Sequence, residues 1–415
     1  MMSINVAVVG TLDTKGHEIK YLKECIVSHG CSAIVIDVGI LHPPASQADI
    51  ARETVAQAGG STLEQILIRK DRRLAVQTMI NGAAQIVRSL WSEGKLSGIV
   101  SIGGGTGTHI GMGVMRTLPL GLPKLMVSTV ASRDMSKLIG TKDITVMHSV
   151  IDILGLNAIS RKILANAAAA ISQMAKEEVQ IHSSSPIIGL TSFGFITQGA
   201  MRVKEGLERL GYEVAPFHAN GTGGMAMEDL IDQGLISGVM DFALHEFADA
   251  MYGGYCGDIG PGRLEAAGSK GLPQVVVPGG LDCIVLEFNS VETMPPDLRD
   301  RKVFWYDFRS GVRTSRQDML SLAETISDKL NMATGPTKVV IPLKGFSEAD
   351  SLGASLYEPA TNLIFISELK SRLRKDIEVI EVNSHINDLE FSEVAVSTLD
   401  TMMRLMKGQG KIISG

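Results

Sequence analysis

The residues best suited to chemistry form the glycine-rich stretch GGGTGT at positions 103–108, directly after the apolar run 98–102. This run is typical of a buried strand, and the threonines suit the N-terminal cap of a helix that we expect from His109. A helix start presents unpaired backbone N–H groups, and glycines remove the side chains that would hold an anion away. The stretch therefore predicts a binding site for a phosphate or carboxylate group.

The stretch departs from two familiar phosphate-binding patterns. No Lys-Ser/Thr pair follows the glycines, as a P-loop requires, and the last glycine of G-x-G-x-x-G would fall on Thr108 or Ile110. A plain turn that needs positive φ would explain one or two glycines, but four within five positions exceed what turn geometry requires. Anion binding and a plain turn are the two interpretations, and the glycine count favours the first.

A second polar group, Asp13, Thr14 and Lys15, follows the β-branched run 4–9. In a doubly wound sheet, ligands bind beyond the carboxyl ends of the strands, so this turn and the glycine-rich stretch would share one edge. Lys15 could pair with a phosphate, Thr14 could donate a hydrogen bond, and Asp13 could bind a hydroxyl or a hydrated magnesium ion. The alternative is an ordinary cap of the next helix, with Lys15 in solvent.

Four cations gather in RKDRR, residues 69–73, where the helical pattern 72–94 begins. Positive charges at a helix start oppose the preference set by the helix dipole. They are therefore either solvated surface charges or groups that face an anion.

The second half of the sequence holds most of the histidines and acids that could do chemistry. These residues lie at or near predicted turns and are His218, Asp241, His245, Glu246, Asp249, Asp258, Asp282 and Glu287. Cation binding or general acid/base catalysis would need two or three of them to converge in the fold. His218 is the first catalytic candidate, because the turn 220–224 beside it could hold an anion, although a histidine that only caps or packs is the alternative. Asp282, after the glycine turn 278–280, is the second candidate, as a ligand or substrate clamp.

Composition and charge exclude several classes of protein. The 415 residues are 45% apolar and 20% charged, which favours a globular α/β protein of more than one domain. The net charge of −6 gives no basic field, so nucleic-acid binding is not expected. Cys25, Cys31, Cys256 and Cys283 form no C-x-x-C pair and indicate neither a zinc knuckle nor a disulfide framework. Without a signal-peptide pattern or a long apolar segment, we expect a cytoplasmic protein that does not span a membrane.

The order of the predicted elements indicates an α/β fold. A strand at 4–9, a helix at 17–29 and a strand at 33–37 form a βαβ unit, whose right-handed crossover makes the sheet parallel. The second half begins in the same way, with a strand from Ile187, a helix at 197–210 and a strand at 212–217, before a helix at 225–233. Further strands are expected at 238–242, 274–277, 303–308, 338–342 and 377–382. The polar break before Pro186 places the domain boundary, which gives domains 1–183 and 184–415.

Three motifs in this order resemble the uncharacterised protein family UPF0261, also called the Tm-1-like ATP-binding family: GTLDTK at 10–15, GGGTGT at 103–108 and HANGTGG at 218–224. The resemblance covers nearly the whole chain. It implies two tandem Rossmann-like domains with mainly parallel sheets, ATP bound by the first domain, and self-association into a homo-oligomer. Carried onto this sequence, it implies that the nucleotide contacts Asp13, Thr14, Lys15, Arg72, Gly103, Gly104, Gly105, Thr106 and Gly107.

Two functions from different classes follow. In the first, the protein is an ATP-binding module whose cofactors are ATP and, through Asp13, Mg²⁺, and whose second domain binds a further molecule. In the second, it is an enzyme that acts on a small anionic metabolite near His218 and Asp282, with ATP-dependent phosphoryl transfer as one version. Glycine-rich turns in both halves predict ligand sites at these turns and in the interdomain cleft. No Walker lysine and no carboxylate pair follow the glycine-rich stretch, which favours the binding function.

Overall fold

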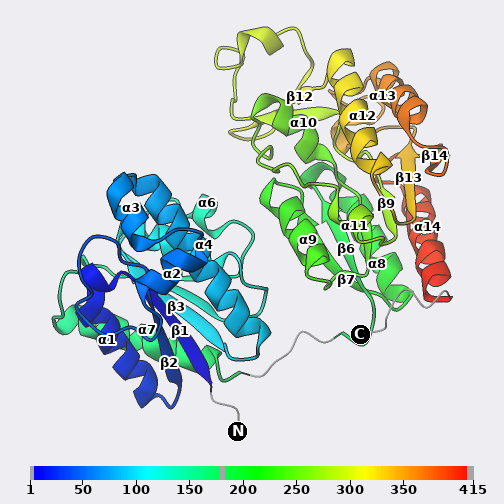
Figure 1. Ribbon diagram of the computed structural model, residues 1–415. Helices are drawn as coiled ribbons and strands as arrows, with labels where there is room; N and C mark the ends of the chain where they lie inside the picture. The colour runs from blue at the N-terminus through cyan, green and yellow to red at the C-terminus, as the bar shows by residue number, and fades with distance from the viewer. Residues whose placement is uncertain (1–3, 178–182, 409–415) are drawn as a thin grey trace. The chain divides into compact units, whose positions relative to one another are not determined.

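The computed structural model describes residues 4–177 and 183–408 of the chain (Figure 1). Its internal contacts separate two units, unit 1 (Met1–Ile181) and unit 2 (His182–Gly415). Each unit contains a sheet of parallel strands with helices on its faces. The predicted fold class, α/β with two Rossmann-like domains in tandem, is therefore confirmed.

Unit 1 is built on five parallel strands in the order β2-β1-β3-β4-β5. They are β1 (Asn5–Gly10), β2 (Ser32–Asp37), β3 (Gly98–Gly103), β4 (Lys124–Ser128) and β5 (Thr145–His148). The chain runs outward from β1 to β2 and then returns to the other side of β1 to form β3. The winding direction therefore changes between β1 and β3, and ligands of doubly wound sheets bind beyond the carboxyl ends of such a pair.

Helices cover both faces of this sheet (Figure 1). They are α1 (Leu12–Ser28), α2 (Arg52–Ala58), α3 (Leu63–Arg69), α4 (Arg72–Ser92), α5 (Gly105–Met115), α6 (Ser136–Ile139) and α7 (Ala158–Met174). Val6 and Val8 of β1 pack in one core with α1 and α7, whereas Ala7 and Val9 pack in another with α2, α4 and α5. A strand buried on both faces is what the apolar run 4–9 indicates.

Unit 2 contains six parallel strands in the order β14-β13-β9-β8-β6-β7. They are β6 (Ile187–Ser192), β7 (Glu213–His218), β8 (Gly238–Asp241), β9 (Gln274–Val276), β13 (Thr337–Pro342) and β14 (Glu378–Val382). The helices are α8 (Thr197–Arg209), α9 (Thr222–Asp232), α10 (His245–Tyr252), α11 (Ala266–Ser269), α12 (Arg316–Asn331), α13 (Pro359–Arg372) and α14 (Leu389–Gly408). One core joins α8 and α14 to the sheet, and another joins α10, α12 and α13 to it.

Unit 2 also has a small antiparallel sheet that the sequence did not predict. Its order is β10-β12-β11, formed by β10 (Cys283–Leu286), β11 (Val303–Trp305) and β12 (Ser310–Arg313). The segment 303–308 was expected as a further strand of the α/β sheet, but its first three residues pair here instead. A strand pattern indicates where a strand lies but not which strand it pairs with, so this sheet was not expected.

Three helices that directly follow a strand begin earlier than the sequence predicted. α1 starts at Leu12 rather than His17, α5 at Gly105 rather than His109, and α9 at Thr222 rather than Met225. Glycine and threonine are poor helix formers, which is why these stretches were interpreted as turns. The structure makes them the first helical turns, directly beyond the strands, where backbone N–H groups have no partner within the helix.

Candidate functional site

A cavity of about 300 Å³ lies in unit 1 beyond the carboxyl ends of β1 and β3. Its lining residues are Thr11, Asp13, Thr14, Lys15, Val38, Ile40, Leu41, Arg72, Val76, Gly103, Gly104, Gly105, Thr106, Gly107 and Ile110. They come from the starts of α1, α4 and α5 and from the segment after β2. The structure thus brings all nine residues of the expected nucleotide site to one cavity. That a nucleotide binds there stays a prediction.

The start of α5 faces this cavity with free backbone donors. Its N-cap residue, Gly104, provides no side-chain acceptor, and the first turn carries no acidic residue. A Cβ atom on Gly103 would lie 2.7 Å from Cα of Gly107, so β3 enters α5 more tightly than a side chain permits. A Cβ atom on Gly105 would meet no described atom within 4 Å. This helix start is therefore both uncapped and open.

Buried polar contacts fix the starts of α1 and α5. The carboxylate of Asp37, at the end of β2, accepts hydrogen bonds from the N–H groups of Leu12 (3.1 Å) and Gly39 (2.8 Å). Burial raises the pKa of Asp37 above its usual range, and the two backbone donors oppose that shift. Oγ1 of Thr108 in α5 lies 2.7 Å from Oγ of Ser128 at the end of β4. The helix starts are therefore held against the sheet before any ligand binds.

Asp13 has one occupied and one free carboxylate oxygen. Its Oδ2 accepts hydrogen bonds from the N–H groups of Leu41 (2.7 Å) and His42 (3.3 Å). Its Oδ1 is buried and has no hydrogen-bond partner within the described residues. A buried carboxylate oxygen without a partner is costly, so this atom is a candidate for a cation or a hydroxyl group.

Lys15 and Thr14 have local partners. Lys15 Nζ donates a hydrogen bond to the carbonyl oxygen of Ile153. Its backbone, with φ −128° and ψ 17°, interrupts α1 immediately after the first turn. Thr14 is exposed, and its Oγ1 lies 2.8 Å from Oγ1 of Thr11. Lys15 therefore contributes positive charge to the cavity from a position where its ammonium group is already engaged.

Arg72 brings a guanidinium group to the start of α5. It is the first residue of α4, whose N-cap Asp71 accepts a hydrogen bond from the N–H group of Leu74 at 3.0 Å. Arg72 Nη2 donates to Oγ1 of Thr106 at 3.0 Å. Arg73 borders an adjoining cavity of about 550 Å³, which shares Arg72 and Thr106 with the first. Arg72 and Arg73 of the RKDRR run therefore border the space in front of α5.

The start of α9, the third glycine-rich motif, already contains an anion. Glu246 of α10 accepts hydrogen bonds from the N–H groups of Gly221 (2.8 Å) and Gly224 (3.3 Å). A Cβ atom on Gly224 would lie 2.4 Å from Glu246 Oε2, so only glycine fits there. The sequence analysis expected this turn to hold an anion beside His218, and the structure fills it with the protein's own carboxylate.

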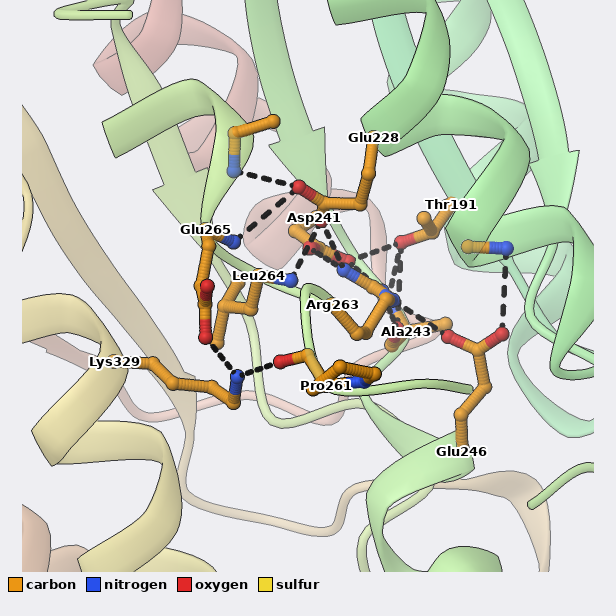
Figure 2. Close-up of polar contacts among 12 residues, drawn as sticks. Thr191, Glu228, Asp241, Ala243, Glu246, Pro261, Arg263, Leu264, Glu265 and Lys329 are labelled. Carbon is orange, nitrogen blue, oxygen red and sulfur yellow. Dashed lines mark hydrogen bonds and ion pairs between the residues drawn. The ribbon is translucent and has the colours of Figure 1, made fainter. Parts of the chain in front are cut away.

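Glu246 belongs to a buried network around Arg263 (Figure 2). Nε of Arg263 donates to Glu246 Oε2 at 2.7 Å, and its Nη atoms donate to both carboxylate oxygens of Asp241 at 2.5 and 2.7 Å. Glu228 lies 3.3 Å from Nη1 and also accepts hydrogen bonds from three backbone N–H groups that follow Arg263. Two acids that the sequence offered as cation ligands, Asp241 and Glu246, thus converge on a guanidinium group.

His245, Asp249 and Cys283 form a second buried cluster. His245 Nε2 lies 3.3 Å from Asp249 Oδ2, and Cys283 Sγ lies 3.9 Å from His245 Nδ1. The order thiol, imidazole, carboxylate is similar to a catalytic triad. Burial raises the pKa of the Cys283 thiol to about 12, so the sulfur stays protonated and does not serve as a nucleophile.

The two catalytic candidates from the sequence occupy different environments. His218 is exposed at the end of the edge strand β7. Asp282 is fully buried between β9 and β10, where its Oδ2 accepts a hydrogen bond from Ser347 Oγ at 2.7 Å. Two strands lie between β7 and β9, which separates these strands by about 14 Å. Neither residue lines the cavity of unit 1, and their catalytic role stays untested.

Six residues of the cavity were not expected from the sequence: Thr11, Val38, Ile40, Leu41, Val76 and Ile110. Residues 38–41 follow β2, whose carboxyl end lies at the same edge as those of β1 and β3. The rule that ligands bind at this edge would have found these residues. Val76 and Ile110 lie inside helices and carry no comparable sequence signal.

The fold and the open helix start define a class of α/β proteins with a ligand cavity at the switch point of a parallel sheet. Two sequence models of one family match this chain: the N-terminal domain of the uncharacterised protein family UPF0261 at residues 4–180, and its C-terminal domain at residues 185–403. The chain therefore belongs to the UPF0261 family, as the three motifs predicted.

Individual relatives support the same assignment. A UPF0261 protein of Clostridium tetani is 42% identical over 405 residues, which cover 97% of this chain and 100% of the relative. A UPF0261 protein of Rhizobium meliloti is 38% identical over 94% of this chain and 97% of its own length. The tomato ToMV resistance protein Tm-1(GCR237) is 32% identical over 95% of this chain, but the match covers 55% of the tomato protein. In the described parts of the chain, no helix combines the length and apolar character of a membrane span.

Proposed function

We propose that the cavity of unit 1 binds ATP. The observation that carries this proposal is the uncapped start of α5, which opens onto the cavity beside Arg72. In the proposed complex, phosphate oxygens accept hydrogen bonds from the N–H groups of residues 105–107, at the positive end of the helix dipole. The Arg72 guanidinium adds charge-assisted hydrogen bonds to the same phosphates.

Apolar side chains next to the proposed phosphate position suit the base and ribose of ATP. Val38, Ile40 and Val76 line the same cavity. A neighbouring cavity of about 260 Å³ shares Ile40, Leu41 and Arg72 with it and extends the apolar surface to Ile66 and Leu67. The combined space falls in the range usual for nucleotide-sized ligands.

The start of α9 supports the proposal from within the same chain. Both helix starts are glycine-rich and follow a parallel strand, but only the α9 start receives a carboxylate from the protein, that of Glu246. Because the α5 start has no acid in its first turn and borders a cavity, its anion comes from solution in this proposal.

Substitution of Gly105 tests the site. Gly105→Val places a branched side chain in the space reserved for phosphate, so we expect calorimetric titration to show ATP affinity lower by at least about tenfold, with an unchanged far-ultraviolet circular dichroism spectrum. Gly194→Val is the matched control, because Gly194 is also exposed with no described atom within 4 Å of its Cβ position, but lies in unit 2. Equal affinities of the two variants would remove the site assignment.

Phosphoryl transfer to a small anionic metabolite is the second candidate function. The observation that favours it is Asp13 Oδ1, a buried carboxylate oxygen without a described partner, which could hold a hydrated Mg²⁺ beside the phosphates. The same titration with and without Mg²⁺, followed by an assay for ADP, separates the two functions. ADP formed only when a metabolite pool is added supports transfer, and bound ATP without ADP supports the binding function.

We also propose that the chain self-associates. Val150, Leu154 and Ile159 lie within ten residues of one another in unit 1, and their exposed fractions are 69%, 80% and 54%. Apolar side chains this exposed and this close in sequence favour contact with another protein surface. A second copy of the chain is the occupant that we propose for them.

A further inference from the structure

Three side chains of unit 2 meet in a closed cluster: His245, Asp249 and Cys256. His245 and Asp249 lie one turn apart on α10, and Cys256 follows in the loop after this helix. One ligand atom from each residue, an imidazole nitrogen, a carboxylate oxygen and the thiol sulfur, lies within 4.8 Å of the other two. Their exposed fractions are 0%, 0% and 4%. An ion bound at about 2.0–2.3 Å holds its ligand atoms at most about 4.4 Å apart, so these side chains would close in slightly to share one.

The backbone around α10 orients the carboxylate of Asp249. Gly253 ends the helix at φ 60°, in the left-handed region that favours glycine, and turns the chain back. The N–H group of Cys256 then donates to Asp249 Oδ2 at 2.8 Å, and that of Val285 in β10 donates to Oδ1 at 2.6 Å. Hydrogen bonds from outside the ligand set are the usual means by which proteins orient metal-binding carboxylates.

A hydrogen bond at Nδ1 orients the imidazole ring of His245. Nδ1 lies 3.2 Å from the carbonyl oxygen of Gly280, which only accepts hydrogen bonds, so we assign the proton to Nδ1. Phe193 stacks on the ring with centroids 3.8 Å apart. Nε2 then faces Asp249 Oδ2 at 3.3 Å and has no aligned hydrogen-bond partner within the described residues. A proton on Nε2 or a metal ion would each offset the charge of Asp249 here, and the lack of an aligned hydrogen bond from Nε2 to Oδ2 favours the metal ion.

We propose that His245, Asp249 and Cys256 bind a zinc ion through Nε2, a carboxylate oxygen and Sγ. A nitrogen, oxygen and sulfur donor set suits zinc, whereas Mg²⁺ and Ca²⁺ take oxygen ligands. Two bonds of about 2.05 Å at the tetrahedral angle separate their ligand atoms by about 3.3 Å, which is the Nε2–Oδ2 distance. The ion joins α10 to the loop that follows it and, through Asp249, to β10, and it leaves the fourth position to water.

The site is independent of the proposed nucleotide site and lies in the other unit. The spacing His-x3-Asp-x6-Cys contains no C-x-x-C pair, which is why the cysteine pattern did not indicate a zinc site. A closed site of this kind stabilises the fold, because the unfolded chain holds no preformed set of ligands.

Refolding with cobalt tests the proposal. The full chain is unfolded and then refolded with Co²⁺, since refolding gives the metal access to a closed site. We expect about one Co²⁺ per chain, a sulfur-to-cobalt charge-transfer band in the near ultraviolet, the visible bands of tetrahedral Co²⁺, and displacement of cobalt by zinc. A refolded wild-type chain that carries no cobalt overturns the proposal.

Cysteine variants identify the sulfur ligand. Cys256→Ser should lose the charge-transfer band and at least about tenfold of the metal affinity, whereas Cys283→Ser and Cys31→Ser should keep both. Cys283 contacts the other imidazole nitrogen, and Cys31 is equally buried but lies in unit 1. An undiminished band in Cys256→Ser contradicts the assignment. If Cys256→Ser fails to refold, the Cys283→Ser chain refolded with zinc tests the proposal instead. This chain is unfolded in the presence of a chromogenic chelator. Release of about one zinc per chain supports the site, and release of none contradicts it.

Discussion

Burial of Asp282 disfavours the charged form of its carboxyl group. Burial, and next the charge of Asp350, raises the pKa of Asp282 to about 6, while Arg313 and the Ser347 hydroxyl oppose the shift. The folded state therefore holds a proton on Asp282 at pH values where the unfolded chain has released it. Ionisation of this residue costs stability, which is the reverse of the usual behaviour of a salt-bridged aspartate.

The pH dependence of stability tests this effect. Because the folded pKa lies above the unfolded pKa of about 3.8, the free energy of unfolding should fall as the pH rises from about 4 to about 6, by up to about 3 kcal/mol from this group. Asp282→Asn removes this contribution, so its stability should change less over the same interval. Urea unfolding of both chains at several pH values provides the measurement, and parallel pH profiles would show that Asp282 does not titrate in this way.

Sequence patterns identified individual residues where local chemistry dictated their role. Glycines 103, 104, 105 and 107 were found because glycines remove the side chains that would hold an anion away from a helix start, and Asp13 because it follows a strand. Arg263 and Cys256 were not found, because their partners are up to 35 residues away and meet them only through the packing of α9, α10 and β8.

At the scale of elements, Arg263 joins three segments of unit 2: the end of β8 through Asp241, α9 through Glu228 and α10 through Glu246. The guanidinium is fully buried, and three carboxylates surround it. Buried ions depend on their partners, because removal of one leaves charges that water does not reach. The arrangement of these elements therefore depends on one side chain.

Removal of this side chain should destabilise unit 2 strongly. Arg263→Met leaves the carboxylates without their cation, and we expect a loss of at least about 3 kcal/mol in the free energy of unfolding, measured with urea. Arg404→Met is the control, because Arg404 is 68% exposed in an ion pair with Asp400 on α14, and this substitution should cost far less stability. Similar losses in both variants would mean that the Arg263 network contributes little.

Element types were predictable where apolar periodicity was long, as in β1 and α4, but the starts of α1, α5 and α9 were not. The start of α5 shows why, because low intrinsic propensity of glycine argued for a loop there. The first turn of α5 is instead stabilised by a tertiary contact, that of Thr108 with Ser128 of β4. Tertiary contacts of this kind override local propensity, and one sequence does not display them.

For the whole molecule, the exposed residues 150–159 lead to a prediction about assembly. Light scattering should give a mass of at least twice the 44.3 kDa of one chain. Leu154→Glu should shift the mass toward 44.3 kDa, because it places a charge in the proposed contact. Leu352→Glu should not, although Leu352 is 84% exposed, because it lies in unit 2. A wild-type chain of monomeric mass would contradict self-association.

The tandem α/β architecture was predictable because the strand, helix and strand pattern repeats after residue 186. Right-handed crossovers then made both main sheets parallel. The antiparallel β10-β12-β11 sheet was not predictable, since the pairing of β10 with β12 joins residues 24 to 30 apart and no local pattern indicates it.

The contrast between the two glycine-rich helix starts has a consequence for how the chain responds to its surroundings. The α9 start carries its anion, Glu246, as part of the polypeptide, so its occupancy does not change with any solute. Under the proposed function, the α5 start takes its anion from solution, and unit 1 gains stability with the logarithm of the ATP concentration once this exceeds the dissociation constant. The start of α9 then stays occupied at every ATP concentration, while the occupancy of the α5 start follows the ATP concentration of the cell by mass action.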